Sequence, residues 1–139
     1  PPRGQRSSGS GRATINAQDG DRINEQVLVC PQIEDMEGVN NIEAIMAVDG
    51  IDVAFIGPND LALSMGLSKT DAFVNTQHVA AIDAILAGAK ANGKPAGTPI
   101  SDVAKARELV EQGFTLIDFG NDLRLLSSAG AAALEGMKA

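Results

Sequence analysis

Two acidic residues, Glu34 and Asp60, follow apolar runs of the chain, and their carboxylates could bind one metal ion together. Gln32 and Glu34 come shortly after the apolar run at residues 27–30, and Asp60 comes shortly after the run at residues 53–56. In parallel α/β folds the functional residues gather at the carboxyl ends of the strands. Strand alternation places Gln32 and Glu34 on the same side of the chain. Two converging carboxylates that offer only oxygen ligands favour Mg²⁺ or Mn²⁺ over Zn²⁺.

Each candidate residue also has an ordinary structural interpretation. An acidic residue after a strand often caps a helix or lies in a solvated loop, so the spacing alone leaves metal binding open. The single histidine, His78, lies at the start of an expected helix with no evident partner, and we expect a surface or capping role for it. The single cysteine, Cys30, ends an apolar run, and we expect it to be a small buried side chain.

The elements that would position these residues alternate between strands and helices. Short apolar runs rich in β-branched residues predict strands at residues 27–30, 53–56, 95–100 and 114–119. Apolar residues at steps of three and four predict helices over residues 39–46, 79–89 and 103–110, and from about 121 through 134. The second helix is expected to end at Asn92 and Gly93, and Asp102 is expected to cap the third, which ends at Gly113. Four βα units predict an α/β fold with a parallel sheet, either a small doubly wound sheet or half of an eight-fold barrel.

The rest of the sequence limits the classes of protein that this chain can belong to. Residues 1–26 contain almost no aliphatic side chains, and we interpret them as a loop-rich segment. The chain of 139 residues has a net charge of −7 and no evident basic face, which argues against a nucleic-acid partner. No apolar run approaches the length of about 18 residues that a membrane span requires. With one cysteine and no leader-like start, we expect a cytoplasmic protein.

Several motifs resemble those of one known family. They are PQIE at residues 31–34, FIGPNDLA at residues 55–62 and SMGL at residues 64–67. Together they resemble the metal-dependent, class II pyruvate aldolases of the HpcH/HpaI aldolase family. PPRG at residues 1–4 and GNDL at residues 120–123 resemble the loop after the fourth strand and the last strand–helix junction of that family. The resemblance therefore extends over nearly the whole chain.

The resemblance implies a fold and a set of site residues. Members of the family fold as TIM (β/α)₈ barrels, so residues 27–139 are expected to form the second half, strands 5 to 8, with the first half outside this sequence. Glu34 and Asp60 resemble the two carboxylate ligands of a divalent ion, which would be Mg²⁺, Mn²⁺ or Co²⁺. The resemblance assigns the keto acid to Gln32, to the turn formed by Gly57, Pro58 and Asn59, and to a pocket wall formed by Thr98 and Pro99.

The resemblance also implies an activity and partners. We expect a carbon–carbon lyase that cleaves a 4-hydroxy-2-keto acid to pyruvate and an aldehyde by a retro-aldol reaction. The family's pyruvate-clamping Arg and proton-transferring His belong to the first half, so no catalytic residue is assigned here. Open sheet edges predict a homo-oligomer or a complementary barrel half as partner. Two alternatives are a non-catalytic remnant that acts only by association, and a citrate-lyase-like or malyl-coenzyme A lyase-like protein.

Overall fold

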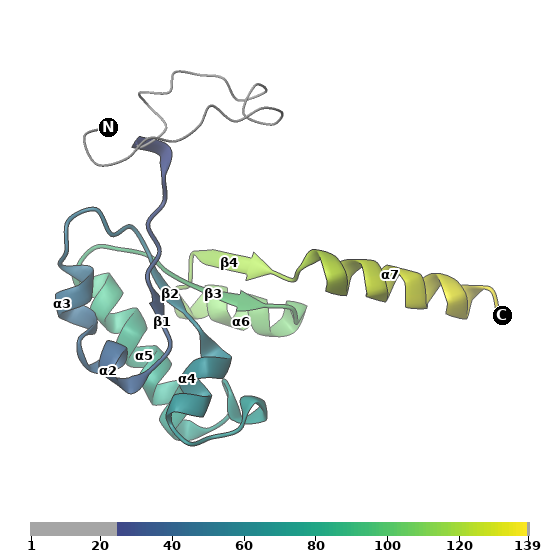
Figure 1. Cartoon of the computed structure of the whole chain (residues 1–139), viewed down its shortest axis with the longest axis horizontal. Coiled ribbons are helices and arrows are strands. Elements are labelled where there is room, and N and C mark those ends of the chain that lie inside the picture. The colour runs from purple at the N-terminus through teal and green to yellow at the C-terminus, as the bar shows by residue number, and fades with distance from the viewer. Residues whose placement is uncertain (1–24, 139) are drawn as a thin grey trace, which may run out of the picture.

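A computed structural model describes residues 25–138, and its backbone alternates between strands and helices as the sequence predicts (Figure 1). Of the segment interpreted as loop-rich, residues 1–24 lie outside the described residues. The elements in chain order are β1 Gln32–Ile33, α2 Met36–Asn40, α3 Ile42–Met46, β2 Ala54–Ile56, α4 Pro58–Ser64, the 3₁₀ helix η2 Lys69–Asp71, α5 Thr76–Ala91, β3 Ala96–Ile100, α6 Val103–Gln112, β4 Leu116–Phe119 and α7 Asp122–Gly136.

The four strands form one sheet in the order β1-β2-β3-β4, and every neighbouring pair is parallel. The predicted parallel α/β fold is therefore confirmed. Because all four strands run in one direction, their carboxyl ends lie along a single edge of the sheet. The residues that follow β1 and β2 are thus neighbours at that edge.

The first strand does not lie where the sequence predicts it. Residues 27–30 form no strand, and β1 comes after Pro31 instead. The segment still runs beside the next strand, because the Val29 carbonyl accepts from the Asp52 amide at 2.9 Å and the Pro31 carbonyl accepts from the Phe55 amide at 3.1 Å. Val29 is 43% exposed, although it is apolar. The prediction of a strand here rested on apolar content alone. The regular pairing with β2 that defines a strand begins only after Pro31.

The helices follow the predicted pattern with two differences. The helix expected over residues 39–46 is divided at Asn41 into α2 and α3. A short helix that was not predicted, α4, begins directly after β2 with Pro58 at its first position. The predicted ends of α6 are confirmed: the Asp102 carboxylate accepts from the Lys105 amide at 2.7 Å, and Gly113 takes the left-handed conformation at φ 110°.

The hydrophobic core lies between one face of the sheet and the helices α2, α3, α5 and α6. On α5 the buried stripe contains His78, Ile82 and Ile85, whereas Val79, which was expected in this stripe, is 37% exposed. Cys30 is half-buried rather than fully buried. The register places Ile33, Ile56 and Thr98 on the covered face, because strand partners point to the same side.

The last helix differs from the others because it does not return to the sheet. In Figure 1, α7 extends away from the remaining helices. None of its residues is buried, and Leu123 and Leu126 are among its exposed apolar side chains. No helix in the described part of the chain combines the length and apolar character needed to cross a membrane.

Candidate metal centre

Gln32 and Glu34 form a side-chain pair at the point where β1 ends. Gln32 Nε2 donates a hydrogen bond to Glu34 Oε2 over 2.7 Å, and both side chains are exposed. This contact confirms that the two side chains lie on the same side of the chain. The hydrogen bond uses one N–H of the Gln32 amide and leaves its carbonyl oxygen and second N–H available. One carboxylate is thereby oriented by a neutral group.

Gly57 lies directly against this pair. The Gly57 amide donates to the Ile33 carbonyl at 3.0 Å, which aligns the turn after β2 with the end of β1. A Cβ atom at position 57 would lie 2.6 Å from Gln32 Nε2 and 2.9 Å from Glu34 Oε2. The φ angle of Gly57 is −94°, which any residue can adopt. Glycine is therefore required here for space, since the pair on β1 occupies the volume that a side chain would need.

The turn after β2 continues directly into the first turn of α4. Pro58 is buried at the first helical position, while Asn59 and Asp60 are exposed beside it. The first intrahelical hydrogen bond runs from the Leu61 amide to the Gly57 carbonyl at 2.9 Å. The amides of Asn59 and Asp60 precede that bond, so they have no partner within the helix. Two backbone donors and one carboxylate are thus presented at the edge where Glu34 lies.

The donor set fits a hard divalent cation better than zinc. Glu34 and Asp60 follow adjacent parallel strands at the same sheet edge, and both offer carboxylate oxygens. Neither forms an ion pair within the described residues. The described residues also contain no group of three or more His, Cys, Asp or Glu side chains that could hold a metal ion. With at most two protein carboxylates, water or substrate oxygens would complete the coordination shell, as is usual for Mg²⁺.

The two residues assigned to the pocket wall lie on opposite faces of the sheet. Thr98 is fully buried on the helix-covered face, where its hydroxyl donates to the Ile56 carbonyl at 3.3 Å. Strand alternation places Pro99 on the other face, together with Gln32. The structure therefore brings Pro99, but not Thr98, to the face of the Gln32–Glu34 pair.

His78 lies in the core and not at the surface. It was expected at the surface or at a helix cap, yet it is fully buried, with 0% exposure. Its Nδ1 accepts from the Phe73 amide at 3.1 Å, and its Nε2 lies 2.8 Å from the Pro58 carbonyl. The signal that could have revealed this burial is spacing, because position 78 lies four residues before Ile82 and seven before Ile85 on the buried stripe.

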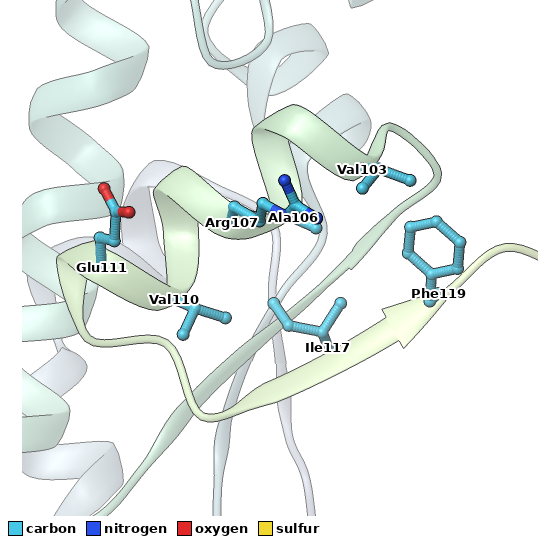
Figure 2. Close-up of a pocket in the computed structure, with 7 residues that line it drawn as sticks. All are labelled: Val103, Ala106, Arg107, Val110, Glu111, Ile117 and Phe119. Atoms are coloured by element: carbon cyan, nitrogen blue, oxygen red, sulfur yellow. The ribbon is translucent and has the colours of Figure 1, made fainter.

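Two grooves among the described residues lie away from this site. The first, with a volume of about 460 Å³, lies between α6 and β4. Figure 2 shows Val103 and Val110 of α6 facing Ile117 and Phe119 of β4 across it. The second lies between α5 and the loops that precede β3 and β4, which places it at the amino end of these strands. Neither groove is lined by a residue assigned to the candidate site.

Comparison with known proteins identifies relatives over most of the chain. Residues 2–129 match the family described as HpcH/HpaI aldolase/citrate lyase. A 5-keto-4-deoxy-D-glucarate aldolase from Klebsiella pneumoniae is 37% identical over 115 residues, which cover 83% of this chain and 44% of the relative. A hydroxypyruvate/pyruvate aldolase from Cupriavidus necator is 39% identical over 134 residues, which cover 93% of this chain and 49% of the relative.

Among solved structures, the fold is similar to that of an HpcH/HpaI aldolase/citrate lyase family protein from Burkholderia cenocepacia J2315. The TM-score is 0.78 at 32% sequence identity, and the match covers 97% of this chain and 53% of that structure. The chain thus spans about half the length of the relatives that it matches.

Proposed function

Because this chain belongs to the HpcH/HpaI aldolase/citrate lyase family, we propose that it supplies the metal and keto acid half of a carbon–carbon lyase. The reaction would be the retro-aldol cleavage of a 4-hydroxy-2-keto acid to pyruvate and an aldehyde. The observation that carries this proposal is the Gln32–Glu34 pair packed against Gly57, at the sheet edge that also holds Asp60. The names of the two aldolase relatives support the same class of reaction.

Glu34 and Asp60 would hold the divalent ion, which would be Mg²⁺, Mn²⁺ or Co²⁺. Retro-aldol cleavage leaves negative charge on the pyruvate enolate, and a divalent ion bound there would stabilise that charge as a Lewis acid. The exposed position of both carboxylates supports this assignment, since a bound keto acid could reach them. The hydrogen bond from Gln32 would restrict Glu34 to one orientation.

The neighbouring groups would bind the organic part of the substrate. Gln32 keeps a free N–H and a carbonyl oxygen and can contact the keto acid without adding charge to a site that already holds an anion. The amides of Asn59 and Asp60 would donate to the substrate carboxylate. Gly57 and Pro58 would form the turn that lets the substrate approach the backbone, and Pro99 would form part of the pocket wall. Thr98 would not contact the substrate, and its hydrogen bond to the Ile56 carbonyl would instead hold β3 against β2.

The proton transfer needs a group other than His78. A retro-aldol reaction removes a proton from the substrate hydroxyl, and a histidine is a common base for such a step. His78 is buried, and both of its ring nitrogens lie within hydrogen-bonding distance of backbone groups. We therefore propose that the base and the cationic clamp for pyruvate come from the part of the barrel that the relatives have beyond the length matched here.

We further propose that the four strands are strands 5 to 8 of a (β/α)₈ barrel and that the protein associates with other copies or with a complementary half. The groove between α6 and β4 supports association, because its lining includes the exposed apolar side chains Val103, Val110 and Phe119. The exposed leucines of α7, which extends away from its own sheet, support it as well. A cytoplasmic setting is part of the same proposal, and the one free cysteine is compatible with it.

The proposed activity is tested by following pyruvate release from a 4-hydroxy-2-keto acid. We expect release that stops when the metal is chelated, resumes when Mn²⁺ is added, and is lost in Asp60→Asn. The matched control is Asp83→Asn, because Asp83 is an exposed carboxylate on α5, away from this sheet edge. No release from the folded chain, even with its association partner present, would favour the non-catalytic alternative. Release that requires coenzyme A would favour the citrate-lyase-like alternative.

A further inference from the structure

His78 makes two hydrogen bonds that together fix its tautomer. The Phe73 amide donates to Nδ1 at 3.1 Å, so Nδ1 must carry the lone pair. Nε2 therefore carries the proton and donates to the Pro58 carbonyl at 2.8 Å. The ring is fully buried, so water cannot substitute for either partner.

The acceptor of this hydrogen bond belongs to the candidate metal centre. Pro58 is the first residue of α4, and Asp60 lies two residues further along the same turn. The N-cap residue of α4, Gly57, has no side chain to bond the first turn. The hydrogen bond from the His78 imidazole on α5 to the Pro58 carbonyl therefore ties the first turn of α4 to the rest of the protein.

The other partner of the ring connects it to a third segment. Phe73 has a φ of 63°, a conformation that favours glycine, and its amide points at His78. The Phe73 ring meets the imidazole edge to face at a centroid distance of 5.9 Å, and Lys105 Nζ of α6 lies 5.8 Å from the Phe73 ring centre. The loop before α5, the first turn of α4 and α5 itself thus meet at one buried ring.

We propose that His78 is a positioning residue for the metal centre: its Nε2–H holds the first turn of α4 so that Asp60 faces the side of Glu34. This inference rests on the proposed function, since it assigns a role toward the same site. His78 touches neither the metal nor the substrate and acts through Pro58. Loss of the Nε2–H donor would leave the Pro58 carbonyl with only its hydrogen bond inside the helix and would remove the tie to α5. The first turn of α4 could then shift, and Asp60 would shift with it.

Two substitutions at position 78 distinguish the effect of the Nε2–H hydrogen bond from the effect of side-chain packing. His78→Gln keeps an N–H at about the reach of Nε2, whereas His78→Asn keeps an acceptor near the position of Nδ1 and has no donor of that reach. Two readouts are compared in the 139-residue chain: amide hydrogen exchange at Leu61 and Ala62 in α4, and the Mn²⁺ dissociation constant measured by calorimetry. Ile85→Ala, a core truncation on the same helix, is the control for loss of stability.

In His78→Asn, we expect these amides to exchange hydrogen roughly tenfold faster than in the wild type. We also expect Mn²⁺ to bind about fivefold to tenfold more weakly. Both changes are on the scale of one lost hydrogen bond. His78→Gln should stay within about twofold of the wild type in both readouts, a difference too small to reflect a lost hydrogen bond. Ile85→Ala should lower stability without weakening Mn²⁺ binding.

The inference and the proposed function fail in different ways. Equal amide exchange in His78→Asn and His78→Gln would overturn the role of His78, whether or not metal binds. Equal Mn²⁺ affinity in the two variants would overturn it as well, provided that the wild-type chain binds Mn²⁺. A wild-type chain without Mn²⁺ binding would instead contradict the proposed metal centre.

Discussion

A methyl group at position 57 should disable the metal centre while leaving the fold intact. In Gly57→Ala, the new Cβ would start 2.6 Å from Gln32 Nε2 and 2.9 Å from Glu34 Cβ, whereas ordinary contacts begin at 3.4 Å. Gln32 must therefore move by 0.8 Å (3.4 minus 2.6) and Glu34 by 0.5 Å (3.4 minus 2.9). Because both side chains are exposed, the overpacking should cost only about 1 kcal/mol of unfolding free energy, the low end of the usual range.

The effect on metal binding should be larger than the effect on stability. Displacement breaks the 2.7 Å hydrogen bond that orients Glu34. Loss of such support for a metal ligand typically lowers affinity by about 10- to 100-fold, and we expect that range for Mn²⁺ measured by calorimetry.

Gly88→Ala is the matched control for this prediction. A Cβ at position 88 would lie 2.6 Å from Ile42 Cγ2 in the core, far from the Gln32–Glu34 pair in the chain and on another element. Thermal unfolding should report a cost of about 1–3 kcal/mol for Gly88→Ala, with unchanged Mn²⁺ affinity. Wild-type affinity in Gly57→Ala, or equal losses of affinity in both variants, would show that the space beside Gly57 does not position Glu34.

Three further predictions concern single hydrogen bonds. Asp102→Ala removes the cap of α6, whose carboxylate accepts from the Lys105 amide at 2.7 Å, and should cost about 1 kcal/mol in denaturant unfolding. Thr98→Val removes a buried hydroxyl on the helix-covered face; it should cost about 1 kcal/mol and leave Mn²⁺ affinity unchanged, and a loss of affinity would show that Thr98 lines the site. Ser68 donates to Asp71 and lowers the pKa of that carboxyl below its ordinary value of 3.8. This interaction contributes stability above pH 3.8 that is lost as pH falls through the lowered pKa, so an NMR titration of Ser68→Ala should return the Asp71 midpoint toward 3.8.

Most of the sheet could be predicted because its strands lie in largely apolar runs, two of which are followed directly by glycine, at Gly57 and Gly120. The runs at residues 53–56, 95–100 and 114–119 each contain an observed strand. The strand predicted at residues 27–30 was wrong because a strand requires pairing with a neighbouring strand. The pairing with β2 begins only after Pro31. Helix α4 was missed because its seven residues, PNDLALS, are too few to show a helical period, although proline at the first position was an available signal.

The candidate site divides in the same way between local and long-range features. A period of two is a local property, so the pairing of Gln32 with Glu34 could be predicted. The need for glycine at position 57 depends on the register of β1 against β2, which the sequence does not encode locally. The placement of Thr98 also required the structure, since in a largely apolar strand the sequence does not show which face is covered. His78 was misplaced because its two partners are backbone groups, at Phe73 and Pro58, that no motif reveals.

We propose that Glu34 and Asp60 together hold a divalent ion to which the keto acid binds. Calorimetric titration of the 139-residue chain with Mn²⁺, with and without pyruvate, tests it most directly. We expect one Mn²⁺ site whose affinity pyruvate raises and that both Glu34→Gln and Asp60→Asn abolish. Binding that persists in both variants, or no binding to a folded chain, would show that these two carboxylates do not form the metal site.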